Sequence, residues 1–339
     1  MGSIVKRQSF IDNAKAFAIL LVLIGHTDGI PKFLEIFIYS FHIPAFFFLS
    51  GYLVSDNKLK TEFGNYAINQ LKGLVIPYIV FGLISLLYAT LNNVIKFGNI
   101  NIPDMLVGLL YGNSEGLKIN IVLWFFTCLY VTSMVFFILS RFLITRNIVY
   151  FSLLLCVLFF TVYLPAHKTR PPWNLDLSVV ALVFYASGKY LSEISIQSLA
   201  NATKSSVFAV LAPIILSLCY FGYQNGRIDM AFLMFKNPLL FFINSFMGIS
   251  ALLIVSILLP DSKFTLFLSK NTIVIFPLHP IIFSIFTGIG MILFKLPHSF
   301  QDSILFTVLY TCGAITICYP ISLCLFTYVP FVVGGRKKA

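Results

Sequence analysis

Two basic side chains share one face of the first apolar segment, in the run IDNAKAFAILLVLIGH. Lys15 and His26 are eleven residues apart. At about 100° per residue, this spacing puts both on the same side of a helix, about 16 Å apart along its axis. Asp12 lies three residues before Lys15, where it can pair with the ammonium group. Headgroup snorkelling of Lys15 and an interfacial His26 would explain each residue alone. Their shared face instead predicts a functional polar stripe across the membrane.

A second imidazole lies in the next apolar run, FLEIFIYSFHIPAFFFLSGYLV. His42 is in its middle, and Pro44 is expected to kink the helix there because proline removes a backbone hydrogen bond. A polar group of this kind inside lipid needs partners. Ser50 and Gly51 follow two turns later, where glycine allows another helix or a ligand to approach closely. We therefore count Ser50 as a candidate substrate-binding residue.

A third imidazole lies in SKNTIVIFPLHPIIF near the end of the chain. His279 stands between Pro277 and Pro280, which predicts a broken helix with an imidazole at the break. Asn271 and Thr272 are expected to cap the start of this helix. His279 is therefore a further candidate for substrate binding.

Other catalytic signatures are missing from the sequence. There is no GxSxG elbow, P-loop, GxGxxG before a helix or HExxH, and no pair of carboxylates within a predicted span. The six cysteines all lie in apolar runs without CxxC spacing, so neither a metal site nor a disulfide framework is expected. The side chains left for catalysis are the imidazoles, with Lys, Asp, Ser and Asn in supporting roles.

The composition requires a membrane. Of the 339 residues, 59% are apolar and 10% are charged, against about 45–50% and about 25% in soluble domains. The net charge of +11 is attributed to cytoplasmic loops, so nucleic acid is not an expected partner. Ten spans of about 20 residues would use roughly 200 positions. We therefore expect one integral-membrane domain over residues 1–339.

Apolar runs predict an all-α polytopic membrane protein with about ten transmembrane helices. Placing both termini in the cytoplasm leaves about 15 Lys and Arg residues on the inner side and about 8 outside, as the positive-inside rule favours. The runs lie at roughly 10–27, 33–55, 73–92, 121–140, 147–164, 175–191, 206–223, 239–259, 272–294 and 303–332.

Two outer loops have unusual content. The connection at about 93–120 contains the apolar stretch IPDMLVGLLY, which is too short to span and predicts an interfacial or re-entrant helix. The loop 165–174 (PAHKTRPPWN) is basic although outward. Either the span count is wrong there, or the loop holds cations for another reason. Arg170 and Trp173 are candidates for an acceptor platform, a cation beside an aromatic ring.

Four segments, in this order, resemble the membrane-bound acyltransferase 3 family: IDNAKAFAILLVLIGH, FHIPAFFFLSGY, LWFF and NTIVIFPLHP. The resemblance covers nearly the whole chain and is to the short members that O-acetylate surface sugars. The first-helix signature of the family is a basic residue, ten residues and a histidine, here Lys15 and His26. Trp124 lies in LWFF, as an interface anchor or as part of the substrate site.

The resemblance implies transfer of an acyl group, usually acetyl, from cytoplasmic acyl-CoA to a carbohydrate hydroxyl on the outer side. Acyl-CoA is then a co-substrate, with no bound cofactor, and the protein is expected in a bacterial cell membrane. The matching His26 is expected to be catalytic and the matching Lys15 to serve the acyl donor. The basic position is often Arg, and Lys15 lacks the bidentate fork of a guanidinium.

Acyl transfer from a thioester also fits the residues themselves. A hydroxyl acceptor needs a base within hydrogen-bonding reach, and imidazole has a suitable pKa. We assign His26 as the general base and His42 to orient the thioester carbonyl or relay a proton. Straight hairpin geometry separates the two by about 12 Å in height. Lys15, fixed by Asp12, would lie nearer the CoA. Phosphate-binding candidates are Lys58, Lys60, Lys72, Arg141 and Arg146.

Two other functions use the same observations. Broken helices and polar groups near the middle of the membrane are also typical of transporters, here a flippase of lipid-linked sugars. A non-catalytic membrane subunit would instead use the histidines for assembly. Consumption of acyl-CoA that depends on an acceptor distinguishes the enzyme from both.

Overall fold

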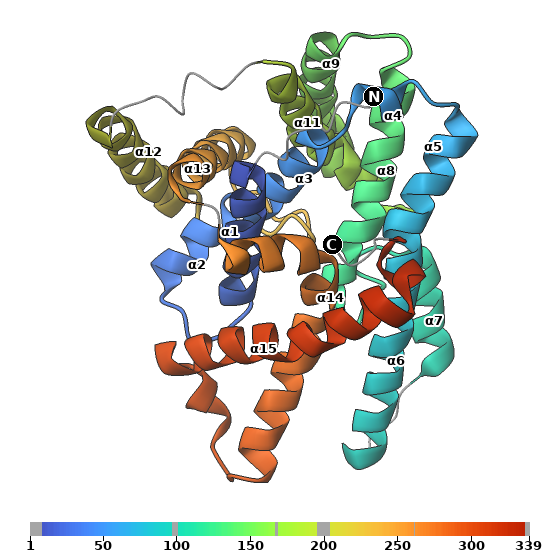
Figure 1. Cartoon of the computed structure of the whole chain (residues 1–339), viewed down its shortest axis with the longest axis vertical. Coiled ribbons are helices and arrows are strands. Elements are labelled where there is room, and N and C mark those ends of the chain that lie inside the picture. The colour runs from blue at the N-terminus through green and yellow to red at the C-terminus, as the bar shows by residue number, and fades with distance from the viewer. Residues whose placement is uncertain (1–8, 97–100, 167–168, 195–203, 261, 336–339) are drawn as a thin grey trace.

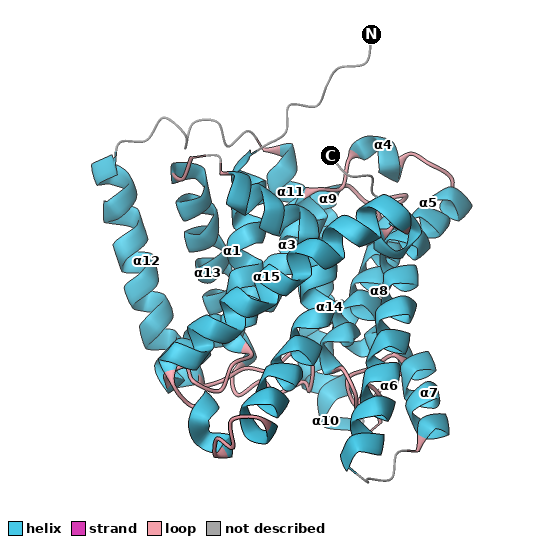
Figure 2. Ribbon diagram, turned by 60° about the horizontal axis from the view of Figure 1, so that its bottom comes forward, coloured by secondary structure: helices cyan, strands magenta, loops and turns pink. Residues whose placement is uncertain are grey.

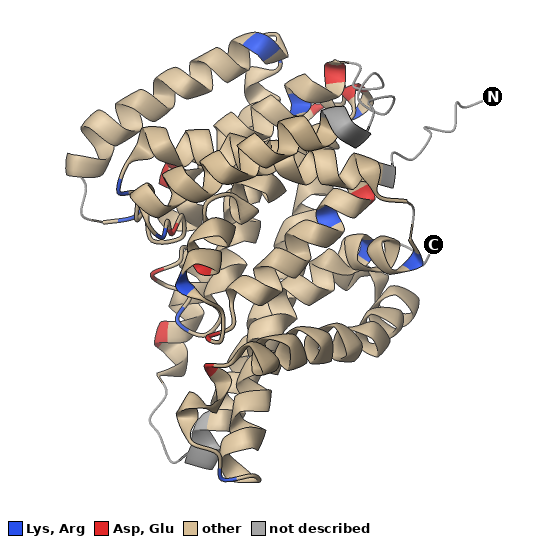
Figure 3. Ribbon diagram, turned by 90° about the vertical axis from the view of Figure 1, so that its left-hand side faces the viewer, with Lys and Arg blue, Asp and Glu red and all other residues tan. Residues whose placement is uncertain are grey.

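The computed structural model describes residues 9–96, 101–166, 169–194, 204–260 and 262–335, and within these ranges the chain is helical (Figure 1). Charged residues lie mainly at helix ends and in loops, so long stretches of helix carry none (Figure 3). Eight segments are long and apolar enough to cross a membrane: Lys32–Tyr52, Phe63–Asn92, Ile121–Leu139, Thr145–Ala166, Val207–Asn225, Pro238–Leu258, Lys263–Ile292 and Ile304–Tyr328.

The structure therefore supports eight membrane-spanning candidates where the sequence predicted about ten. The other two predicted spans form the helices α1 (Ser9–Gly25) and α11 (Leu175–Glu193). α1 is 17 residues long, and α11 contains the charged residues Asp176, Lys189 and Glu193. Both helices pack inside the bundle, α11 against three other α-helices and α1 against five. Helices surrounded by protein can carry polar residues that lipid would exclude.

Two groups of helices surround the centre of the bundle. α11 packs on α3 (His42–Tyr52), α8 (Trp124–Leu139) and α9 (Thr145–Leu158). α1 packs on α3, α2 (Lys32–Tyr39), α13 (Pro238–Leu258), α14 (Lys263–Ile292) and α15 (Ile304–Tyr328). Helix α3 therefore contacts both groups and lies between them (Figure 1).

Peripheral helices complete the bundle. α12 (Lys204–Asn225) packs on α13 and on α2 (Lys32–Tyr39), while α6 (Ile76–Lys96) packs on α7 (Ile102–Tyr111). α7 is a ten-residue apolar helix, which confirms the short helix predicted in this connection. It lies at the opposite end of the molecule from α4 and α5 (Figure 2). The remaining elements are α4 (Asp56–Leu59), α5 (Phe63–Gln70), α10 (Leu164–Ala166), the π-helices at Leu71–Val75 and Phe159–Tyr163, and four 3₁₀ turns at Ile121–Leu123, Pro172–Asn174, His298–Gln301 and Pro330–Val333.

Helices α3 and α11 touch backbone to backbone. A Cβ atom built on Gly51 would overlap the carbonyl oxygen of Tyr185, and one built on Gly188 would overlap that of Phe48. Glycine is required at both positions because any side chain would push the two helices apart. The predicted close approach at Gly51 is thus confirmed, and its partner is another helix.

The predicted kink at Pro44 was wrong. The chain breaks earlier, between α2 and α3, where Phe41 has φ −149° and ψ −12°. Pro44 then falls in the first turn of α3, where a missing N–H has no helical acceptor to lose. The break places His42 at the first residue of a new helix.

Two expectations for the segment around His279 were also wrong. α14 runs as one helix from Lys263 to Ile292 through both prolines, and Ser262 caps it by accepting a hydrogen bond from the Phe264 amide. Asn271 and Thr272 lie inside this helix and donate to the carbonyls of Phe267 and Leu268. Such back-bonding satisfies polar side chains within a helix, so no cap is needed there.

Candidate functional site

Three imidazoles meet between α1, α3 and α14. The ring centroid of His26 lies 4.9 Å from that of His279 and 6.5 Å from that of His42. Tyr39 adds a phenol ring 4.9 Å from His42 and 6.3 Å from His26. The predicted height difference of about 12 Å was wrong because the break after α2 shifts the start of α3 out of a straight hairpin. His26 and His42 therefore face a common space.

Each imidazole is fixed to its own helix by the same kind of bond. The Nδ1 atoms of His26 and His42 lie 2.8 Å from the carbonyls of Val22 and Ile38, and that of His279 lies 2.6 Å from the carbonyl of Phe276. A carbonyl oxygen can only accept, so each Nδ1 carries the proton. In the neutral rings, Nε2 is then left with a lone pair that can accept a proton.

Proline explains how α14 holds His279. The carbonyl of Phe276 would normally accept from the amide of residue 280, but Pro280 has no N–H. The His279 ring takes its place as donor. Its Nε2 is buried and has no hydrogen-bond partner among the described residues. The Pro–Leu–His–Pro sequence is thus a local device that orients a buried imidazole without breaking the helix.

A cavity of about 330 Å³ opens beside the histidines. His26 and His42 line it, whereas the fully buried His279 lies behind His26 and does not. Trp124, only 4% exposed, also lines the cavity, so it is a wall residue and not an interface anchor. Asn120 belongs to the same wall and donates to the Ser85 hydroxyl and the Pro277 carbonyl, both at 2.9 Å.

The opposite wall is an irregular segment between α12 and α13. Residues 227–232 all line the cavity. The Arg227 guanidinium lies 4.4 Å from the centre of the Tyr39 ring and 3.2 Å from the carboxylate of Glu35. Burial raises the pKa of the Asp229 carboxyl, although the nearby Arg227 charge opposes this shift. Charged and aromatic groups therefore surround the entrance to the histidines.

Lys15 and His26 both face α14, which confirms that they share a face. The Lys15 ammonium donates to the carbonyl of Ser269 at 2.9 Å, and the Ser269 hydroxyl donates to the Asp12 carboxylate at 2.6 Å. Ser269 therefore links Lys15 and Asp12, the two residues that were predicted to lie near the acyl donor. Neither Lys15 nor Asp12 lines the histidine cavity, in agreement with a position further along the helix.

Two other predicted residues lie away from the cavity. Ser50 is two turns along α3 from His42 and is not part of the cavity wall. Arg170 is buried beside Asp176 and also does not line the wall, whereas Trp173 donates from its indole nitrogen to the carbonyl of Leu110. The Arg170 charge is therefore paired with a carboxylate inside the protein, which is a reason for a cation in this loop other than membrane topology.

The sequence did not single out Tyr39, Asn120, Arg227 or Asp229. Tyr39 lies three residues before His42, at the end of α2, and this closeness in the sequence was a usable signal. Asn120 directly precedes an apolar run, where a buried amide is unusual. Arg227 and Asp229 lie in a loop, and no local pattern relates this loop to His26 and His42, which stand far earlier in the sequence.

The fold and the cavity define an integral membrane protein with a buried imidazole site. The model of a family described as an acyltransferase domain, acyltransferase 3, matches residues 8–323. The chain therefore belongs to the acyltransferase 3 family and is a multi-pass membrane acyltransferase. Searches of curated proteins and of solved structures gave no match.

Proposed function

We propose that this acyltransferase moves an acyl group, acetyl in the simplest case, from cytoplasmic acyl-CoA to a hydroxyl of a cell-surface or lipid-linked carbohydrate. The observation that carries the proposal is the cavity lined by His26, His42 and Tyr39, with the Nδ1 proton of His26 bound to the Val22 carbonyl so that Nε2 is left as the proton acceptor. The proposal places the protein in a bacterial cell membrane with both termini in the cytoplasm, as the distribution of Lys and Arg favours.

In the proposed reaction, His26 is the general base. The acceptor O–H bond breaks as its proton moves to Nε2, and the oxygen bonds to the thioester carbonyl carbon. The tetrahedral intermediate collapses with cleavage of the C–S bond. The proton then passes from His26 to the leaving thiolate and gives free CoA, which balances the reaction without a cofactor.

The hydrogen bond of His42 favours one of the two roles that were predicted for this residue. Because its Nδ1 proton is committed to the Ile38 carbonyl, neutral His42 offers a proton acceptor and no donor for a thioester carbonyl. This supports the proton-relay alternative over orientation of the carbonyl. His279 is behind His26, where its unpartnered Nε2 would stabilise positive charge on that ring and would not touch a substrate.

The acyl donor is assigned to the Lys15 side. Lys15 and Asp12 of α1 form a polar group with Ser269, on the side of α1 that leads to His26 just after the end of the helix. A CoA headgroup held near this group would direct its thioester arm towards the histidines. A single lysine supplies a point charge for phosphate, so part of the binding energy must come from other residues.

Vesicles containing the purified protein test the proposed function. Acetyl-CoA on one side, with envelope carbohydrate from a strain lacking the gene as acceptor, should release free CoA only when the acceptor is present. Mass analysis should then find a new ester on the carbohydrate. Movement of the carbohydrate across the membrane without CoA release would overturn the proposal in favour of transport.

Lys15→Met tests the donor side. Loss of the ammonium group should raise the KM for acetyl-CoA about tenfold, as expected for loss of one charge-assisted hydrogen bond, and leave the KM for the acceptor unchanged. Initial rates over both concentrations separate the two constants. Lys263→Met, an exposed lysine at the start of α14, is the matched control. Equal changes in both constants would contradict a donor-specific role.

A further inference from the structure

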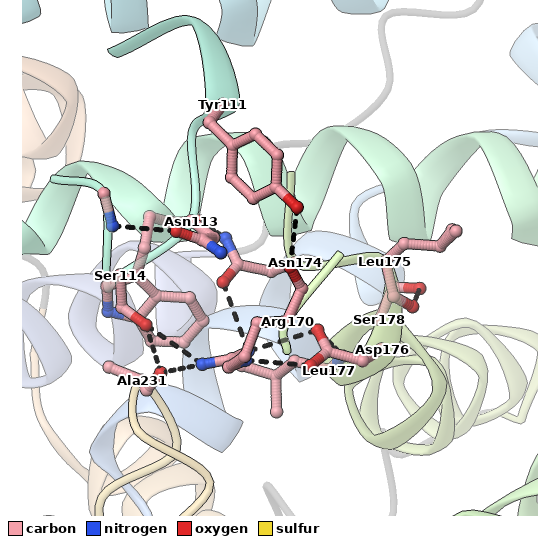
Figure 4. Close-up of polar contacts among 12 residues, drawn as sticks. Tyr111, Asn113, Ser114, Arg170, Asn174, Leu175, Asp176, Leu177, Ser178 and Ala231 are labelled. Carbon is pink, nitrogen blue, oxygen red and sulfur yellow. Dashed lines mark hydrogen bonds and ion pairs between the residues drawn. The ribbon is translucent and has the colours of Figure 1, made fainter. Parts of the chain in front are cut away.

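The guanidinium of Arg170 is buried, and all three of its nitrogens donate hydrogen bonds (Figure 4). Nε and Nη2 bind the two carboxylate oxygens of Asp176 at 2.8 and 3.1 Å. Nη1 binds the Ser114 hydroxyl at 3.0 Å and the carbonyl of Ala231. Nη2 also reaches the side-chain oxygen of Asn174 at 3.3 Å. Every nitrogen of the planar guanidinium therefore has a hydrogen-bond partner within the protein.

These bonds join three segments that are far apart in the sequence. Asp176 lies in the first turn of α11, Ser114 follows α7, and Ala231 belongs to the irregular segment between α12 and α13. The Ser114 hydroxyl itself donates to the Ala231 carbonyl. Two donors therefore converge on a single backbone oxygen, and one of them is held by a buried ion pair (Figure 4).

Ala231 is part of the cavity wall at residues 227–232. This wall has no regular helix to fix its position, apart from an isolated pairing of the backbones of Asp229 and Met234. Arg227 ties the same wall to α2 through its ion pair with Glu35 and its contact with the Tyr39 ring. The bonds to the Ala231 carbonyl form a second anchor, which holds the backbone of the wall directly at a residue that lines the cavity.

We propose that Arg170 and Ser114 are positioning residues that hold the wall 227–232 over the histidine cavity and so determine the affinity for the acceptor. The proposal rests on the proposed function, because the wall faces the base that activates the acceptor. A buried ion pair is a weak source of stability compared with apolar packing. Its role at this site is to position Arg170. Because Asp176 holds Nε and Nη2 of the guanidinium, Nη1 is directed at the Ala231 carbonyl of the wall.

Ser114→Ala is the decisive variant because it removes one anchor bond and leaves the Arg170–Asp176 pair intact. With acetyl-CoA and the envelope carbohydrate described above, its KM for the acceptor should rise three- to tenfold, as expected for loss of one hydrogen bond. The kcat and the KM for acetyl-CoA should stay within twofold of wild type. Arg170→Lys should give a larger rise in the same constant.

Hydrogen exchange supplies a readout that does not depend on activity. Backbone amides of residues 228–236 should exchange faster in Ser114→Ala, while those of α11 keep their wild-type rates. Ser178→Ala is the matched control, because this nearby serine donates only to the Leu175 carbonyl of its own helix. It should change neither the exchange nor the kinetic constants.

The outcomes separate the two proposals. Wild-type exchange and an unchanged acceptor KM in Ser114→Ala would overturn the positioning role, as would equal changes in kcat and both KM values. If wild-type protein releases no CoA with acceptor, the proposed function fails. Faster exchange confined to residues 228–236 would still establish that Ser114 anchors the wall. Should Arg170→Lys fail to fold, Ser114→Ala alone decides.

Discussion

Replacing His26 by alanine is expected to lower acceptor-dependent release of CoA by at least a hundredfold. General bases in this position contribute about 10²–10⁴ to the rate. His42 cannot substitute, because its ring is held to Ile38 and lies 6.5 Å from the ring of His26. The rate is measured at saturating acetyl-CoA and acceptor, with equal amounts of protein in the vesicles.

His298→Ala is the control for this loss. His298 lies in the turn between α14 and α15, bonds to Gln301 and does not line the cavity. Its removal should leave the rate unchanged. A His26→Ala protein that inserts normally and turns over at the wild-type rate would refute the assignment of the base.

Gly51→Ala should be the most damaging small substitution in the helix core. The added methyl group would overlap the Tyr185 carbonyl, and backbone cannot move aside as the end of a flexible side chain can. Overpacking of this kind costs about 1–3 kcal/mol or more. The thermal unfolding midpoint in detergent should fall by several degrees, and activity should fall with it because α3 carries His42 at its first residue.

Gly288→Ala provides the comparison. Gly288 is inside α14, and a Cβ built there meets nothing within 4 Å. Alanine in a helix is favoured over glycine by about 1 kcal/mol, so this variant should be as stable as wild type or slightly more stable. An equal loss of stability in both variants would mean that the α3–α11 contact is looser than the structure shows.

Local periodicity made part of the site predictable. The eleven-residue spacing of Lys15 and His26 requires only the geometry of one helix, and both residues do face α14. The paired prolines around His279 likewise marked a position where the backbone needs a substitute donor. These signals are contained within a few turns of chain.

The remaining features depend on distant contacts. The break before His42 has no strong helix-breaking residue of its own, since Ser40 and Phe41 are compatible with a helix and Pro44 only marks the new start. The wall 227–232 reaches the cavity through loop geometry, and its anchor comes from Arg170 and Ser114 on other segments. No spacing rule relates these residues, and for this reason Arg170 was predicted to bind the acceptor directly.

The bonds from each imidazole to the helix turn before it have a further consequence. A histidine on a flexible loop must be ordered anew in every catalytic cycle, which adds an entropic component to the barrier. Here the rings of His26, His42 and His279 lose their rotational freedom once, when the chain folds. Any motion that limits turnover must then belong to the substrates or to the segments around the cavity, while the imidazoles themselves stay in place.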